Sequence, residues 1–193
     1  MENKVTYGLE DVHIAFMNPA SLAPPEWETP EAIPGAVRFT PNPQGQESTF
    51  YADNEAYFVV STNDGYKAEL EMALIPDAIK ARILGWEIDS NGMLVEVADG
   101  TPEPFALLGQ VLGDKKNRRF VYYNNIASRP TQEHRTRGES VTPDTEVLSI
   151  TVTPIEIAGK NIVKGVLPLT ETNKTKYDAF FGSVLLPAFE TGA

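Results

Sequence analysis

Strict alternation of apolar and polar residues in short segments constrains this fold more than any other feature of the chain. In Tyr66–Leu74 every even-numbered position from 68 onward is apolar, while three of the intervening positions are charged. Val147–Val152 repeats the pattern, with leucine, isoleucine and valine on one side. Because successive side chains of a β-strand point to opposite faces, both segments predict strands with one face on a core and one face in water.

The rest of the chain is divided into short segments by fifteen prolines and fourteen glycines. Phe105–Leu112 and Arg118–Ile126 flank the polar residues Gly113–Asn117, which predicts a hairpin with a polar tip. The remaining predicted strands are Ile33–Thr40, Ser48–Ala52, Ala56–Ser61, Met93–Val97 and Ile162–Val166.

Two segments carry helix signals. Pro76–Leu84 begins with a proline at its first position, has an aspartate in its first turn and is followed by Gly85 as a stop. A second helix is expected from Lys174 to Leu185, with Asn173 as its N-cap and apolar residues at helical spacing. Many strands and few helices predict a mainly β fold, a β-sandwich or barrel-like domain with one flanking α-helix and a C-terminal helix.

The length favours a single domain. Residues 1–193 are expected to form one packed unit with extended loops or arms near residues 18–29, 41–54 and 128–145. The longest of these, Ser128–Thr145, is either a flexible surface loop or an arm that a neighbouring subunit orders. The chain has no cysteine, so we expect packing alone to hold the fold together.

The net charge of −11 argues against ordinary nucleic-acid binding, which needs clustered lysine and arginine. Surplus carboxylates either aid solubility or keep a surface close to DNA without holding it. No apolar run approaches the roughly 20 residues of a membrane helix, and the N-terminus has no apolar signal segment. We therefore expect a cytoplasmic product that does not bind membranes.

The sequence lacks the motifs of common catalytic sites. It has no glycine-rich phosphate loop and no Gly-x-Ser-x-Gly elbow. Its two histidines, His13 and His134, have no second ligand at helical spacing, so we predict neither a metal site nor a cofactor. His13 is expected just after the first strand, as a structural residue. We predict that the protein is not an enzyme; an acid/base hydrolase that uses two of its carboxylates ranks third among the hypotheses.

Four motifs in order along the chain resemble one protein family. They are Tyr7-Gly8-Leu9, the stretch Ile33–Asn54, Ala73-Leu74-Ile75-Pro76-Asp77 and Ala127-Ser128-Arg129-Pro130. Together they resemble the major tail proteins of long, non-contractile-tailed phages of the siphovirus type. The resemblance covers most of residues 1–155.

This resemblance implies a structural subunit of a phage or prophage tail tube. In that family two sheets form a sandwich with a flanking helix, and stacked, hexameric rings make a tube that conducts the genome without binding it specifically. The implied partners are other copies of the chain, the tape-measure protein, and the tail-tip, distal tail and terminator proteins. The implied location is the virion tail, reached after assembly in the host cytoplasm.

On this hypothesis Glu69 and Glu71, on the polar face of Tyr66–Leu74, are candidates for lining the lumen, where carboxylates would repel phosphate. Rings of copies that each carry −11 should also repel one another, so assembly should favour salt. The candidates for intersubunit contacts lie in the predicted arms and in a basic hairpin tip: Pro41, Gln44, Gln46, Tyr51, Lys115, Lys116, Arg118, Arg129 and Arg135.

A binding module is the alternative function. A β-sandwich that binds carbohydrate or a surface receptor, associated with tail machinery, would show the same strand pattern. Such modules display aromatic rings on one sheet, and the predicted strands carry the pairs Phe50-Tyr51, Tyr57-Phe58 and Tyr122-Tyr123. Because neighbouring strand residues point to opposite faces, we expect at most one residue of each pair to serve such a platform.

Overall fold

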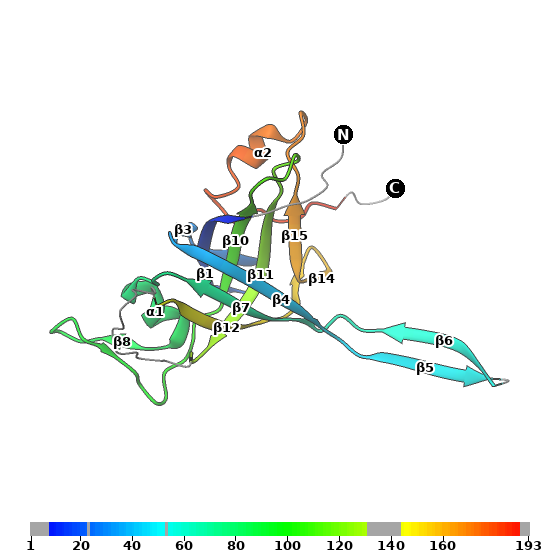
Figure 1. Ribbon diagram of the computed structural model, residues 1–193, viewed down its shortest axis with the longest axis horizontal. Coiled ribbons are helices and arrows are strands. Elements are labelled where there is room, and N and C mark those ends of the chain that lie inside the picture. Colours follow the sequence, from blue (N-terminus) through cyan, green and yellow to red (C-terminus); the bar gives the residue numbers. More distant parts are fainter. Residues whose placement is uncertain (1–7, 23, 53, 131–143, 190–193) are drawn as a thin grey trace, which may run out of the picture.

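A computed structural model of the chain describes residues 8–22, 24–52, 54–130 and 144–189. Within these ranges nine strands form one antiparallel sheet in the order β2-β1-β10-β11-β12-β7-β4, with β3 paired to β1 and β15 paired to β11 (Figure 1). The elements are β1 (Leu9–Leu22), β2 (Pro25–Trp27), β3 (Glu31–Ala32), β4 (Ala36–Gln44), β5 (Glu47–Ala52), β6 (Glu55–Ser61), β7 (Gly65–Met72), α1 (Asp77–Leu84), β8 (Glu87–Ile88), β9 (Leu94–Val95), β10 (Phe105–Val111), β11 (Arg119–Ser128), β12 (Glu146–Val152), β13 (Ile155–Ile157), β14 (Lys160–Ile162), β15 (Lys164–Leu167) and α2 (Lys174–Asp178).

The large sheet divides because β11 changes partners along its length. Its first half pairs with β15, and its second half pairs with β12, which continues through β7 to β4. β4 then returns to the neighbourhood of β1 without pairing with it. The predictions of a mainly β fold and of a flanking helix are confirmed. Nine of the described strands belong to one large curled sheet and not to two separate facing sheets, and the others form the two-stranded pairs β5–β6, β8–β9 and β13–β14.

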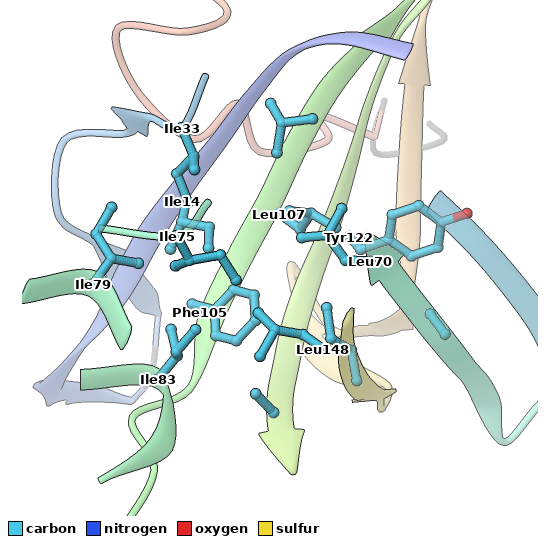
Figure 2. Packing of buried hydrophobic residues seen from close by; sticks show 14 of the residues in the cluster. Ile14, Ile33, Leu70, Ile75, Ile79, Ile83, Phe105, Leu107, Tyr122 and Leu148 are labelled. Atoms are coloured by element: carbon cyan, nitrogen blue, oxygen red, sulfur yellow. The ribbon is translucent and has the colours of Figure 1, made fainter. Parts of the chain in front are cut away.

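The main core lies between this sheet and α1. Alternation correctly identified its residues on β7 and β12, since Leu70 and Leu148 are almost completely buried. They belong to the same cluster as Phe105 of β10 and two helix residues, Ile79 and Ile83 (Figure 2). Ile79 and Ile83 lie four residues apart and form the buried side of α1, and the left-handed φ of +69° at Gly85 ends the helix as expected. Pro76 is the N-cap of this helix and not its first residue.

Several segments that carried no strand prediction do form strands, among them β3, β8 and β13. β1 runs through Asn18 to Leu22, β2 follows it, and β4 extends as far as Gln44. Pro41 and Pro43 are tolerated within β4 because, in the part of the chain that the structure describes, this strand pairs only with β7 and has an open edge. Conversely, Leu74 lies beyond the end of β7 and is exposed.

Other predicted bounds need smaller corrections. Strand β4 begins only at Ala36, β9 keeps just two residues of Met93–Val97, and buried Val163 separates β14 from β15 within the predicted strand Ile162–Val166. The predicted hairpin is confirmed as β10 and β11.

The C-terminal helix is much shorter than predicted. It ends at Asp178 and not at Leu185. The carbonyl of Tyr177, which a longer helix would use internally, accepts a hydrogen bond from Arg119 Nη1 at 2.5 Å. The side chain of Asn173 also does not cap the helix; its amide oxygen accepts from the N–H of Thr170 at 2.9 Å. Phe180 is nevertheless buried, so the predicted apolar face packs as an irregular segment.

This C-terminal segment covers the second face of the sheet. Phe180 belongs to a separate cluster with Leu108 of β10 and Tyr123 of β11. The hydroxyl of Tyr123 donates to the carbonyl of Leu185 at 2.9 Å. Both faces of β10 and of the first half of β11 are therefore largely buried, whereas β12, β7 and β4, which follow in the sheet, present a polar face to solvent.

Candidate interaction surfaces

Among the described residues, the most exposed apolar surface is a hairpin, β5–β6, that projects from the body (Figure 1). We call residues 47–61 the hairpin arm. The exposed fraction of its large apolar side chains runs from 43% at Val60 to 75% at Tyr57. Monomeric proteins rarely leave so continuous an apolar surface in water. The exposed residues are Phe50, Tyr51, Tyr57, Phe58, Val59 and Val60.

Neither face of the hairpin arm packs on the body. Phe50 pairs directly with Phe58 across the strands, and both rings are exposed. Their chain neighbours Tyr51 and Val59 are exposed as well. The expectation that only one residue of an aromatic pair could be available therefore fails for the arm, because a strand with no core on either side exposes both. In β11 the opposite holds, and Tyr122 and Tyr123 are both buried.

Hydrogen bonds between its two strands continue from the sheet into the base of the hairpin arm. The N–H of Thr62 donates to the carbonyl of Gln46 at 2.9 Å, and the Thr62 hydroxyl accepts from the Gln46 N–H at 2.9 Å. The N–H of Asp64 donates to the carbonyl of Gln44. A side chain at Gly45 would meet the Thr62 carbonyl oxygen, so glycine is needed at this joint. The predicted contact residues Gln44 and Gln46 thus hold the base of the arm.

A groove of about 510 Å³ opens between β4 and β15, and we call it the β4–β15 groove. Phe120 and Tyr122 of β11 lie at its floor, and burial raises the pKa of Tyr122 to about 12, so its hydroxyl stays protonated. Val37 and Val166 are lining residues that remain half exposed. The predicted contact residue Pro41 is also part of the lining.

The groove lining carries more positive than negative charge. Its charged residues are Arg38, Arg118 and Lys164 against Asp114. Asp114 is buried, accepts the backbone N–H groups of Lys116 and Arg118, and lies 3.5 Å from the Arg118 guanidinium. The Lys164 ammonium lies 5.0 Å from the centroid of the Tyr66 ring. The basic hairpin tip predicted from the sequence therefore contributes one wall of the groove.

The structure disperses the other predicted contact residues. Lys115 and Lys116 are exposed at the tip of the β10–β11 hairpin. Arg129 pairs with Glu96 at 2.9 Å on the surface. Arg135 lies outside the described residues, as does most of the predicted arm Ser128–Thr145.

The two candidate lumen residues lie on the polar face of β7, as predicted. Glu69 is exposed, and its neighbours across the strands are Thr40 and Ser149. Glu71 is less exposed; it pairs with Arg38 at 3.2 Å and accepts a hydrogen bond from the Thr145 hydroxyl at 2.7 Å. This face is therefore rich in hydroxyl groups, and part of its negative charge is neutralised locally.

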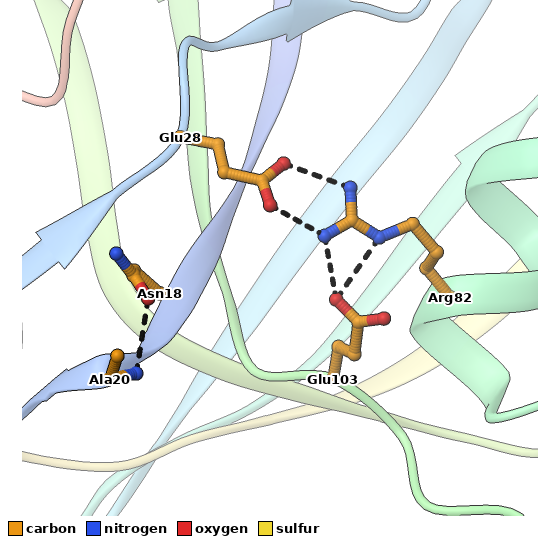
Figure 3. Close-up of polar contacts among 5 residues, drawn as sticks. All are labelled: Asn18, Ala20, Glu28, Arg82 and Glu103. Atoms are coloured by element: carbon orange, nitrogen blue, oxygen red, sulfur yellow. Dashed lines mark hydrogen bonds and ion pairs between the residues drawn. The ribbon is translucent and has the colours of Figure 1, made fainter.

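Arg82 joins α1 to two distant segments and was not singled out from the sequence. Its guanidinium binds both carboxylate oxygens of Glu28 at 2.9 Å and one oxygen of Glu103 at 2.7 Å (Figure 3). It also lies 3.7 Å from the centroid of the Phe16 ring. The hydrogen bond from Arg82 holds the pKa of Glu28 below its usual value. In the same view, the Asn18 side chain accepts from the N–H of Ala20 and steadies the end of β1.

Metal-ligating side chains are not clustered in the described part of the chain. No group of three or more histidine or carboxylate side chains there is arranged to hold a metal ion. His13 lies within β1 and not after it; its Nδ1 is 2.8 Å from the Asp11 carbonyl oxygen, and its ring stacks on Phe181. None of the described helices is long and apolar enough to span a membrane.

Comparisons with known proteins add no identification. No family model matches the chain, and a search of curated proteins finds no match.

Proposed function

We propose that this chain is the structural subunit of a phage or prophage tail tube, built from stacked rings of identical copies that are most simply hexameric. The single observation that carries the proposal is the hairpin arm, which exposes six large apolar side chains on a hydrogen-bonded stalk. Exposing such an apolar surface to water is unfavourable in a monomer. It is typical of a surface that a neighbouring subunit covers.

The polar face of β4, β7 and β12 is the surface that we propose lines the lumen of the tube. It presents hydroxyl groups, the carboxylates of Glu69 and Glu71, and the basic side chains of Arg38 and Lys67. In a ring this face would line the lumen, where its two carboxylates offset the two basic side chains and no large cluster of lysine and arginine would retain DNA. The expected partners are other copies, the tape-measure protein, and the proteins that start and end the tube.

Negative-stain electron microscopy of the concentrated protein, at low and then at high salt, tests this function. We expect rings or hollow tubes, in greater number at high salt, because each copy carries −11 and screening weakens the repulsion. Compact particles without a lumen, or a chain that remains monomeric even with a tail-tip complex as initiator, would contradict the proposal.

The exposed rings of the arm also favour a second candidate, a module that binds carbohydrate through Phe50, Tyr57 or neighbouring aromatic residues. Aromatic rings stack on the apolar faces of sugars, and here they are already free of the core. Glycan-array binding by the isolated monomer, lost in Tyr57→Ser, would support this module and oppose the tube.

A further inference from the structure

We propose that the hairpin arm of one copy seats in the β4–β15 groove of a second copy. This inference rests on the proposed function and deepens it, since it names the two surfaces that meet. The arm and the groove are different surfaces of the same chain, so the contact is head-to-tail. Such contacts repeat from copy to copy and close into rings or continue as filaments.

The apolar surfaces of the arm and the groove match in character. The arm carries exposed aromatic and valine side chains, and the groove offers a floor of Phe120 and Tyr122 with half-exposed Val37 and Val166 beside them. Each surface is apolar and partly open to water in the single chain. Docking of the arm in the groove would remove both apolar surfaces from water. Burial of apolar surface is the dominant favourable contribution to the free energy of association.

The arm cannot reach the groove of its own copy without breaking its joint. The groove is lined by Val37–Pro41 of β4, and the same strand continues outward to Gln44 at the base of the arm. The hydrogen bonds between Gln46 and Thr62 hold the arm in line with β4 and β7. Figure 1 shows the hairpin directed away from the body. The occupant is therefore a second copy.

Open strand edges border the groove on two sides. In the described ranges β4 pairs only with β7, and β15 pairs only with β11. An incoming strand could bond to either edge, with its side chains entering the groove, as in other cases of β-strand addition. The two-stranded arm also has open outer edges, since β5 and β6 pair only with each other among the described residues.

The charges of the two surfaces are complementary. Residues 47–61 contain Glu47, Asp53 and Glu55 and no lysine or arginine. Of the three basic residues in the groove lining, Arg38 pairs with Glu71 and Arg118 pairs with Asp114, whereas the ammonium of Lys164 lies against the rings of Tyr66 and Tyr122. In a chain of net charge −11, the ammonium of Lys164 in an apolar groove favours an acidic partner there. The arm is such a partner.

Cysteine cross-linking of the full chain tests the seat directly, because the natural sequence has no cysteine. Tyr57→Cys protein is mixed with Val166→Cys protein and treated with a short bis-maleimide, and mass spectrometry identifies the joined peptides. The matched control replaces Val166→Cys with Ile88→Cys, at an exposed position of similar character on β8. Docking raises the effective concentration, so we expect the arm–groove product to exceed the control by about tenfold or more.

The possible outcomes distinguish the arm–groove contact from the proposed tail-tube function. Specific cross-linking in rings, tubes or smaller oligomers supports the seat, and its presence without any ring or tube would contradict the proposed function alone. Rings or tubes in which the arm–groove product does not exceed the control would overturn the seat and leave the tube in place. Protein that stays monomeric at high concentration and gives no specific product also overturns the seat.

Discussion

Arg38 of β4 and Glu71 of β7 form an ion pair across neighbouring strands, with 3.2 Å between Nε and Oε2. The pair lies on the face of the sheet that is opposite the main core, beside the exposed carboxylate of Glu69. The pair connects the polar face of β7 with the β4–β15 groove, because Arg38 also lines that groove. The two carboxylates proposed to line the lumen are therefore not equivalent, and Glu69 would contribute more of the repulsion.

The double variant Glu69→Lys, Glu71→Lys should fold and assemble but eject DNA poorly, since lysine would attract phosphate in the lumen. We expect Glu69→Lys alone to change the free energy of unfolding by less than about 0.5 kcal/mol. Glu71→Lys should cost up to about 1 kcal/mol, because it breaks a surface ion pair. Denaturant unfolding and a DNA-ejection assay on assembled particles measure both effects, and normal ejection by the double variant would exclude the lumenal assignment.

The contact between Arg82 and Glu28 predicts how stability depends on pH. Arg82 lowers the pKa of Glu28 in the folded chain, so the contact stabilises the fold above the usual carboxyl value of 4.5. This contribution is lost as the pH falls through the lowered pKa. Arg82→Met, which keeps an apolar stem beside Phe16, should therefore lose less stability than the natural chain on acidification.

Thermal unfolding at a series of pH values below neutrality measures this difference, with Arg82→Lys as the control that keeps the charge. Parallel acid profiles for the natural chain and Arg82→Met would show that the contact does not govern acid stability.

Arg119 should hold the C-terminal segment on the sheet. Its guanidinium binds Gln110 Oε1 and the Tyr177 carbonyl and lies 3.9 Å from the centroid of the Tyr177 ring. We expect Arg119→Ala to cost about 2 kcal/mol and to speed hydrogen exchange in residues 174–189 but not in β7 or β12. Arg129→Ala, at an exposed ion pair, is the matched control and should leave exchange unchanged.

The hairpin arm should contribute to assembly and not to the stability of the fold. Phe58→Ser should change the free energy of unfolding of the monomer by less than about 0.5 kcal/mol, because its ring is 60% exposed. Leu148→Ala, in the main core, should cost about 2–5 kcal/mol. Denaturant unfolding gives these values, and sedimentation should show weaker self-association only for Phe58→Ser. A large loss of monomer stability in Phe58→Ser would mean that the arm packs on its own body.

An exchange of charges tests the complementarity of the arm and the groove. Glu55→Lys and Lys164→Glu should each weaken self-association several-fold, because each places like charges together. The double variant should recover much of the loss, and sedimentation at low salt would measure it. As a control, Glu87→Lys on β8 should have little effect. A double variant as weak as the single ones would show that these charges do not meet.

Local patterns predicted those elements that are decided within a few residues. Alternation identified the buried sides of β7 and β12, and a polar tip between two apolar runs identified the β10–β11 hairpin. Gly85 ends α1 because its left-handed conformation is available to glycine at little cost. The same reasoning failed after Asp178, where the chain continues in turns instead of a helix and the Tyr177 carbonyl accepts from both the Phe180 N–H and Arg119.

The candidate surfaces were only partly predictable. The sequence by itself determined that the chain is mainly β, that β7 has a charged face with Glu69 and Glu71, and that aromatic residues are clustered at 50–51 and 57–58. Only the tertiary structure decided that these aromatic residues stand clear of the core, that Tyr122 and Tyr123 do not, and that β4 and β15 border an apolar groove. The physical reason is that periodicity records which residues share a face, whereas burial depends on which distant segment covers that face.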